Sequence, residues 1–239
     1  MTTAIILAGG LGTRLRGLVS DLPKPMAPIK NKPFLHHQME YWIGQGVSKF
    51  ILSVGYKSEI IIENFGDSFL GVPVEYSIEN SPMGTGGGLL LATRQLNTKE
   101  PFLLLNGDTY FDVHLNTLKS KFEETNADMV FSLFESKLTE RYLGFEVASE
   151  KITNINVRVE LKNSMVLVNG GVYLIGSKAL DVLRTLHSAG ENFSLESSGF
   201  AELLAAKLNL FFLKSSGNFI DIGVPEDYLK SQCLAHFKN

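Results

Sequence analysis

The sequence predicts an α/β protein whose mostly parallel, Rossmann-like sheet is covered on both faces, giving a three-layer sandwich. Two observations lead to this fold class. Short apolar runs alternate with helix-like segments through residue 134, which is typical of βαβ units and a parallel sheet. Residues 143–176 instead contain successive strand-like runs with little helix between them, which indicates a mixed or antiparallel extension of the sheet.

The individual elements follow from the lengths and periods of these runs. The first run, Ala4–Ala8, is continuously apolar and is expected to be a buried strand. Strands are expected at 4–8, 49–54, 73–78, 101–106 and 128–134. Helices are expected between them at 34–45, 57–65, 85–96 and 115–125.

After the extension, the pattern predicts helices at 177–187 and 199–207 and a strand at 208–213. A last helix should begin at Pro225, because the first turn of a helix tolerates a missing N–H. No linker or repeat interrupts the chain, so we expect one domain, 1–239. Within it, 1–110 would form a nucleotide-binding lobe and 111–239 a lobe for the second substrate.

Composition narrows the classes of function. With 239 residues, 44% of them hydrophobic, the chain can build a substantial core. A net charge of −3 argues against a general nucleic-acid or membrane-surface binder, and no apolar stretch approaches the length of a transmembrane helix. We therefore expect neither nucleic acid nor membrane as a partner. A local basic cluster suits a small anionic ligand, although a solvated surface is the alternative; it comprises Arg14, Arg16, Lys24, Lys30 and Lys32.

Cysteine usage and the N-terminus favour a cytoplasmic protein. Cys233 is the single cysteine, so an intramolecular disulfide and Cys/His metal spacing are both excluded. The first apolar run lacks a preceding basic region and leads directly into glycines, unlike a signal peptide. A homo-oligomer is compatible with the sequence.

A glycine-rich turn follows the first expected strand. Backbone N–H groups in Gly9–Arg14 can approach a ligand closely, as in phosphate-binding turns, although a purely structural turn is the alternative. The turn is not a P-loop, and Leu15 replaces the third glycine of a dinucleotide fingerprint. Nearby, Pro23 and Pro25 restrict the backbone on both sides of Lys24. A lysine presented so rigidly is best explained as a phosphate contact.

Aspartates follow two of the apolar runs. Asp108 comes after residues 103–107, and Asp221 follows Phe219 and Ile220. Ligands of open α/β sheets sit at the carboxyl ends of strands, and Mg²⁺ prefers carboxylates together with substrate phosphates. The alternative is that Asp108 caps a turn. The histidines lack metal spacing and are expected to be structural; they are His36, His37, His114, His187 and His236.

Two further segments place small and polar residues beside strands. In 79–88, Glu79 could accept from both N–H donors of a guanine edge, although an exposed acid at a strand end is the alternative. Four glycines would allow flat contact with a base or ribose, and Thr85 is expected to be a helix N-cap. In 168–173, Asn169 could bond sugar hydroxyls, or the Asn-Gly-Gly step could be a plain β-bulge.

Together these motifs resemble those of the sugar-1-phosphate nucleotidyltransferase family. LAGGLGTRL with PKPM, then SPMGTGGG, NGD, NGGVY and IDIGVPEDY occur in the family's order over nearly the whole chain. The opening segment and the GTGGG variant look most like guanylyltransferases acting on D-glycero-α-D-manno-heptose 1-phosphate, with mannose-1-phosphate guanylyltransferases close behind. Other hexose-1-phosphate uridylyl- or thymidylyltransferases are the next alternative, and a non-catalytic nucleotide or sugar-phosphate sensor is the alternative from a different class.

The resemblance implies Mg²⁺-dependent transfer of GMP from GTP to a sugar 1-phosphate, with GDP-heptose and pyrophosphate as products, for surface polysaccharide biosynthesis. Arg14 and Lys24 would be catalytic, and Asp108 and Asp221 would hold the metal. The nucleotide would contact Leu7, Ala8, Gly9, Gly10, Gly12, Thr13, Arg14, Glu79, Pro82, Gly84, Thr85, Asn106 and Gly107. The sugar phosphate would contact Gly144, Arg158, Asn169 and Gly171.

The chain departs from the family's pattern at two places. Gly17 stands where many relatives have proline, and Val157 and Arg158 stand where many have a Glu-Lys-Pro that binds the sugar and its phosphate. Arg158 could replace that lysine because guanidinium binds phosphate bidentately, and Lys162 is the alternative if the register slips. The missing glutamate leaves the sugar's identity open.

Overall fold

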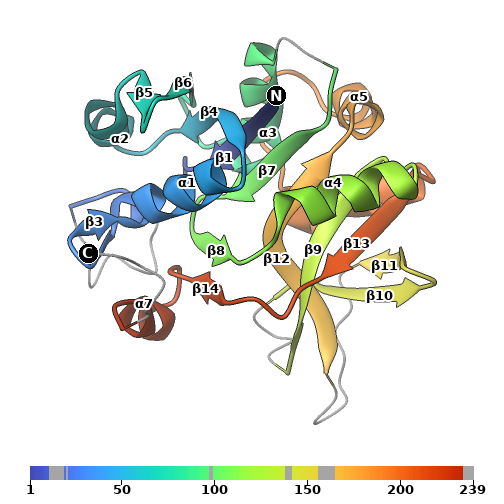
Figure 1. Ribbon diagram of the computed structural model, residues 1–239. Coiled ribbons are helices and arrows are strands. Elements are labelled where there is room, and N and C mark those ends of the chain that lie inside the picture. The colour runs from blue at the N-terminus through green and yellow to red at the C-terminus, as the bar shows by residue number, and fades with distance from the viewer. Residues whose placement is uncertain (11–18, 20, 97–98, 138–141, 156–164, 234–239) are drawn as a thin grey trace.

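A ten-stranded sheet runs through the middle of the molecule (Figure 1), counted over the residues that the structure describes. This structure is a computed structural model, and it describes residues 1–239 apart from 11–18, 20, 97–98, 138–141, 156–164 and 234–239. The strand order is β10-β11-β13-β9-β12-β7-β1-β4-β6-β5. No helix in these described ranges is both long and apolar enough to cross a bilayer.

One half of the sheet is parallel, as expected. Its strands are β1 (Thr2–Leu7), β4 (Val47–Val54), β6 (Val72–Ile78) and β7 (Phe102–Asn106), each within two residues of its expected run. The chain builds outward from β1 through β4 to β6 and then returns to pair β7 with the other edge of β1. The strand order therefore reverses between β1 and β7, and such a switch point is where open α/β sheets bind ligands.

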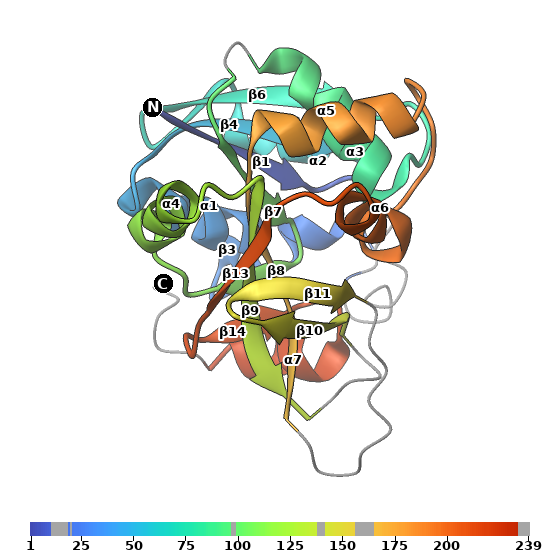
Figure 2. The same cartoon turned by 90° about the vertical axis from the view of Figure 1, so that its right-hand side faces the viewer.

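Helices cover both faces of the sheet, which confirms the three-layer prediction (Figure 2). One face packs on α1 (Phe34–Gly44), α2 (Ser58–Phe65) and α4 (Leu115–Glu124). The other packs on α3 (Gly84–Ala92), α5 (Ser177–Leu186) and α6 (Phe200–Ala205). Because side chains alternate along a strand, Ala4 and Ile6 enter the first core and Ile5 the second.

The other half of the sheet is the mixed extension. Its strands are β9 (Met129–Ser136), β10 (Gly144–Ala148), β11 (Lys151–Ile155), β12 (Val166–Ile175) and β13 (Leu210–Lys214). β12 lies antiparallel between β7 and β9 and so joins the two halves, while β13 is parallel to β9. The sheet is thus continuous across residue 110, and the division into two lobes there stays a prediction.

Several short elements were missed by the sequence patterns. They are β2 (Pro28–Ile29), β3 (Lys32–Pro33), β5 (Ser68–Phe69), β8 (Thr109–Phe111), β14 (Phe219–Asp221), 3-10 turns at Lys24–Met26 and Thr93–Gln95, and a π-helix at Leu195–Gly199. Runs of two to five residues are too short to show a hydrophobic period.

A third, smaller core connects the two ends of the chain. It comprises Ala27, Ile29, Phe34, Tyr110, Ile220, Ile222 and Tyr228. Helix α7 (Pro225–Ser231), which begins at the expected proline, packs here, and the Tyr228 hydroxyl donates to the Pro28 carbonyl at 2.8 Å. The β8–β14 pair and α7 therefore lie against the segment that contains Lys24.

Candidate active site

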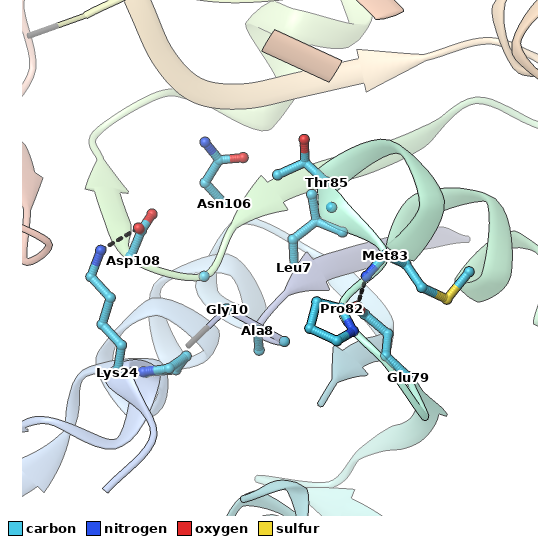
Figure 3. A pocket seen from close by; sticks show the side chains of 14 residues that line it. Leu7, Ala8, Gly10, Lys24, Glu79, Pro82, Met83, Thr85, Asn106 and Asp108 are labelled. Atoms are coloured by element: carbon cyan, nitrogen blue, oxygen red, sulfur yellow. Dashed lines mark hydrogen bonds and ion pairs between the residues drawn. The ribbon is translucent and has the colours of Figure 1, made fainter. Parts of the chain in front are cut away.

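A cavity of about 400 Å³ opens at the switch point between β1 and β7 (Figure 3), a size typical of small-molecule sites. Its lining includes twelve residues that the resemblance assigns to ligands and two, Pro25 and Met83, that it does not. The lining residues are Leu7, Ala8, Gly9, Gly10, Lys24, Pro25, Glu79, Pro82, Met83, Gly84, Thr85, Asn106, Gly107 and Asp108. Gly12, Thr13 and Arg14 lie outside the described residues, and so do Arg158 and Lys162.

The floor of the cavity is formed by the turns after β1 and β7. The Gly107 N–H donates to the Leu7 carbonyl at 2.9 Å, which ties the two strand ends together. A Cβ at Gly107 would lie only 3.2 Å from the Ala8 Cα, and one at Gly9 only 2.5 Å from Glu79 Oε1. Backbone contacts alone therefore require glycine at position 107, before any phosphate is considered, whereas a side chain at position 9 would displace the Glu79 carboxylate.

The charged end of the cavity brings Lys24 and both predicted metal ligands together. The Lys24 ammonium pairs with the Asp108 carboxylate, and only 12% of the lysine side chain is exposed. Strand β14 places Asp221 opposite Thr109, and the Ile222 N–H donates to the Asp108 carbonyl at 3.0 Å. Two aspartates 113 positions apart in the sequence thus lie beside one lysine, Asp108 in the turn before β8 and Asp221 at the end of β14.

Gly223 completes this end of the cavity. Its N–H donates to Asp221 Oδ1 at 2.7 Å, which orients that carboxylate. A Cβ at Gly223 would lie 2.7 Å from the same oxygen and 3.1 Å from Lys24 Cε. The glycine after Asp221 is therefore needed for Lys24 and Asp221 to approach each other. Gly223 is visible in the sequence run Ile-Asp-Ile-Gly, but the contact that requires a glycine there is visible only in the structure.

The donor set fits Mg²⁺ better than a metal held entirely by protein. In the described part of the chain, no group of three or more His, Cys, Asp and Glu side chains is placed to hold a metal. Asp108 and Asp221 supply hard carboxylate oxygens, and Mg²⁺ usually binds one or two carboxylates while substrate phosphates and waters complete its shell. The Asp108 side chain is 37% exposed and lines the cavity, so it is accessible to such a ligand.

The opposite end of the cavity is built around Glu79 (Figure 3). Glu79 Oε1 accepts from the Ser53 hydroxyl at 3.0 Å, and Oε2 accepts from the Met83 N–H at 3.2 Å. The sequence predicted a carboxylate that is free to accept from a base, whereas both oxygens already accept hydrogen bonds from the protein. Each oxygen retains a second lone pair that a ligand can use.

Thr85 is not the N-cap that the sequence predicted. Helix α3 begins at Gly84 with Met83 as its N-cap, without a side-chain cap bond. The Thr85 hydroxyl instead donates to Glu196 Oε2 at 2.6 Å and accepts from the Leu195 N–H at 2.9 Å. The threonine therefore ties the helix start to a segment more than a hundred residues away.

The glycines of α3 also differ from expectation, because most of them contact protein rather than leave a flat surface for a base. A Cβ at Gly84 would lie 2.9 Å from the Phe193 carbonyl carbon, and one at Gly87 would overlap the Glu191 carbonyl. One at Gly86 would enter the Phe193 ring. Of the four glycines after Met83, only Gly84 lines the cavity.

The residues expected to line the sugar gather beside Asn106. At a bulge in β12, the Gly171 N–H donates to Asn169 Oδ1 at 3.1 Å, and Asn169 Nδ2 donates to the Tyr173 hydroxyl at 2.6 Å. Gly171 has φ 71°, and a Cβ there would lie 3.2 Å from Asn106 Nδ2. The bulge alternative is therefore present, and it sits at the ligand edge of the sheet. Gly144 is one strand away, opposite Val168.

A buried acceptor at this edge has no protein partner among the described residues. Asn106 Oδ1 makes no hydrogen bond there, although it is shielded from solvent. Buried polar atoms are nearly always paired, so an unpaired oxygen beside a cavity fits a ligand donor such as a sugar hydroxyl. Burial, and after it the charge of Glu196, raises the pKa of the neighbouring Tyr173 phenol well above its usual value, so it stays a neutral donor.

Comparisons with known proteins identify the family of this chain. The profile of the family described as Nucleotidyl transferase matches residues 3–236. A D-glycero-alpha-D-manno-heptose 1-phosphate guanylyltransferase from Aneurinibacillus thermoaerophilus is 42% identical over 229 residues, 96% of each chain. One of the same name from Campylobacter jejuni is 40% identical over 94% of this chain and 96% of its own.

The crystal structure of HddC from Yersinia pseudotuberculosis is also similar to this chain. It superposes with a TM-score of 0.82 at 32% identity, covering 97% of this chain and 98% of that one, and it has also been solved in complex with GMP-PN. With the profile matched from strand β1 into the last helix, this chain belongs to the nucleotidyl transferase family.

Proposed function

We propose that this protein is a Mg²⁺-dependent guanylyltransferase that transfers GMP from GTP to D-glycero-α-D-manno-heptose 1-phosphate, with release of pyrophosphate. The near-full-length relatives of that name support the substrates. The observation on which the chemistry depends is the placement of Lys24, Asp108 and Asp221 at one end of a switch-point cavity that Gly9 and Gly10 also line.

In the proposed reaction, an oxygen of the sugar phosphate attacks the α-phosphorus of GTP in line. A new P–O bond forms, and the bond from the α-phosphorus to the bridging oxygen of pyrophosphate breaks. The attacking oxygen is already anionic, so no general base is needed. This agrees with a described cavity lining that contains no histidine. Catalysis then depends on positioning and on neutralising the charge of the phosphates.

Lys24 is proposed to stabilise the charge that develops at the α-phosphate. Its backbone is held by the turn between Pro23 and Pro25, where the Met26 N–H donates to the Pro23 carbonyl at 2.8 Å, and its ammonium pairs with Asp108. Asp108 and Asp221 would hold Mg²⁺. The metal would supply positive charge between the two substrates' phosphates. Arg14, which lies outside the described residues, is proposed to contact the departing pyrophosphate.

The remaining assignments divide the cavity into a base side and a sugar side. Glu79 is proposed to accept from guanine through the lone pairs that Ser53 and Met83 leave open. On the other side, Asn169 and Gly171 are proposed to contact the sugar, with Gly144 beside them. Asn106, which the resemblance assigns to the nucleotide, is proposed to contact the sugar as well, because its buried Oδ1 is unpaired among the described residues. Arg158 or Lys162 would bind its phosphate.

A pyrophosphate-release assay tests the proposal. GTP, UTP and dTTP would each be combined with Mg²⁺ and with heptose, mannose or glucose 1-phosphate. We expect the highest kcat/KM for GTP with the heptose 1-phosphate. Faster turnover of mannose 1-phosphate would show that mannose 1-phosphate, not the heptose 1-phosphate, is the preferred sugar substrate. Faster turnover of UTP or dTTP would show the same for the nucleotide. Nucleotide binding without turnover of any pair would indicate a sensor instead of an enzyme.

The base assignment needs its own test. Glu79→Gln keeps the size of the side chain but exchanges one acceptor for a donor, so we expect kcat/KM for GTP to fall more than that for UTP. An unchanged ratio of the two would refute the proposed contact with guanine.

A further inference from the structure

We propose that His187 is a positioning residue for the nucleotide: it fixes an irregular segment, residues 187–196, which in turn holds the turn 82–85 that walls the base end of the cavity. We call residues 187–196 the brace. The inference depends on the proposed function only in identifying the nucleotide as the ligand of that end, since the contacts themselves are within the protein.

The brace is bonded to the wall residue by residue. The Asn192 side-chain amide donates to the Pro82 carbonyl at 2.8 Å, and the Phe193 N–H donates to the Met83 carbonyl at 3.1 Å. In the other direction, the Gly86 N–H donates to the Phe193 carbonyl at 3.0 Å. Residues 82–85 are not part of a strand and so lack the backbone pairing of a sheet, and these bonds fix the position of their backbone.

The glycines at the start of α3 show how close this contact is. The backbone of Glu191 and the carbonyl and ring of Phe193 occupy the positions where Gly84, Gly86 and Gly87 would otherwise place a Cβ. A displacement of the brace would therefore move the start of α3 with it. Gly84, Gly86 and Gly87 thus leave room for the brace, and of these three only Gly84 also lines the cavity.

Residues 187–194 have no helix or strand to define their shape, so side-chain contacts must do so. His187 provides the central one. Its Nδ1 lies 2.8 Å from Glu191 Oε1 and its Nε2 lies 2.6 Å from Glu202 Oε2, while its ring stacks on Phe193 at 3.5 Å with an interplanar angle of 3°. One side chain thus joins the brace to α6 and supports the residue that contacts α3.

A cavity behind the wall makes these bonds decisive. About 140 Å³ of space separates Met83 from α5 and the brace, and His187, Arg94 and Arg184 line it. Because Met83 is not packed solidly on this side, the position of the wall depends on the hydrogen bonds and close contacts of the brace.

The protonation state of His187 follows from its surroundings. Burial opposes the charged ring, but hydrogen bonds and charges of Glu191 and Glu202 outweigh it and raise the pKa of His187 above 6.5. Arg94 on the 3-10 turn after α3 and Arg184 on α5 face the same cavity and oppose protonation. Only the protonated ring donates to both carboxylates. The raised pKa means that the full contact is present below about 6.5 and is lost as the pH rises through the raised value.

The test compares GTP binding by wild-type protein and His187→Gln, measured by calorimetry with GTP and Mg²⁺ before any sugar phosphate is added. A neutral amide keeps one of the two charge-assisted bonds, so we expect GTP affinity to fall about tenfold at pH 6.5, the equivalent of one such bond. As the pH rises from 6.5 to 9, wild-type affinity should approach that of the variant. The nucleotide's own titration is common to both proteins and cancels in the ratio.

His36→Gln is the matched control. His36 also has a glutamate four residues later, Glu40, at 3.8 Å, but it lies on α1 outside the cavity lining. GTP affinity should stay at the wild-type value in this variant. Asn192→Ala is a second test at an exposed side chain, and it should weaken GTP binding without dependence on the titration of His187.

The outcomes separate this inference from the proposed function. Normal GTP affinity in both His187→Gln and Asn192→Ala would overturn the inference, whatever the enzyme transfers. Weakened nucleotide binding in both variants, with normal binding in His36→Gln, would support it, even if no sugar phosphate is turned over and the proposed function fails. A pH-independent ratio between wild type and His187→Gln would overturn the role of the imidazolium.

Discussion

Replacing Lys24 by alanine tests the proposed reaction most directly. The lysine side chain is 12% exposed and lines the cavity, so its charge is screened less than a surface charge. At about 4 Å from a phosphate oxygen and an effective dielectric constant of about 20, one such charge contributes about 4 kcal/mol. If most of this interaction is gained in the transition state, kcat should fall by about 10²- to 10³-fold.

The fold of the Lys24→Ala variant should remain intact. Asp108 loses its partner, but its side chain is 37% exposed and can be hydrated, so we expect the free energy of unfolding to change by no more than about 1 kcal/mol. Steady-state pyrophosphate release at saturating substrates and urea denaturation would measure the two effects. Lys32→Ala is the control, since Lys32 belongs to the same basic cluster but lies on β3, outside the cavity lining.

Two results would refute this reasoning. A kcat within about threefold of wild type in Lys24→Ala would show that the ammonium does not stabilise the transition state. An equal loss of kcat in Lys32→Ala would show that the general positive field of the basic cluster, and not the positioned lysine, is responsible.

Three further changes have defined expectations. Gly223→Ala should lower kcat at least tenfold by displacing the Lys24 amine, with about 1–3 kcal/mol of overpacking in urea denaturation; wild-type kcat would contradict the close approach described here. Thr85→Val should cost about 2–4 kcal/mol of stability, because it removes a bond to a carboxylate and leaves the Leu195 N–H unpaired, whereas Thr85→Ser should cost much less; equal losses in the two variants would contradict the hydroxyl's role. Asp108→Asn should raise the Mg²⁺ concentration needed for half-maximal turnover by tenfold or more, and an unchanged Mg²⁺ titration would argue against Asp108 as a metal ligand.

Much of the fold could be predicted because burial against the core imposes a recognisable hydrophobic pattern on each long helix or strand. The runs that became β1, β4 and β7 are apolar on both sides, as expected for strands buried between two helical layers. The short pair β8 and β14 could not be found in this way, although it brings Asp221 to Asp108. Three-residue strands more than a hundred positions apart leave no local signal of their pairing.

At the site, too, the sequence indicated which residues take part but not which residues they contact. Sequence patterns identified Lys24 and the aspartates, because a positioned cation and strand-end carboxylates have few structural uses together. They assigned Thr85 to a helix cap and the α3 glycines to a base, whereas both contact the brace. Such long-range packing partners depend on where Phe193 lies, and nothing near residue 85 in the sequence indicates that.

The contact of α7 with the Lys24 segment has a consequence for biosynthesis. The Tyr228 hydroxyl and the Gln232 side chain both bond the Pro28 carbonyl, and Asp221 precedes this helix by only a few residues. When a nascent chain has been synthesised as far as the end of β12, it contains the glycine-rich turn and most strands of the large sheet. It still lacks Asp221 and helix α7, which packs on the segment that contains Lys24. Contacts across some two hundred residues form late in synthesis. The end of the cavity that contains Lys24 and Asp108 is therefore completed after the end that contains Glu79, and a chain cut before β14 would retain much of its core without Asp221 beside Asp108.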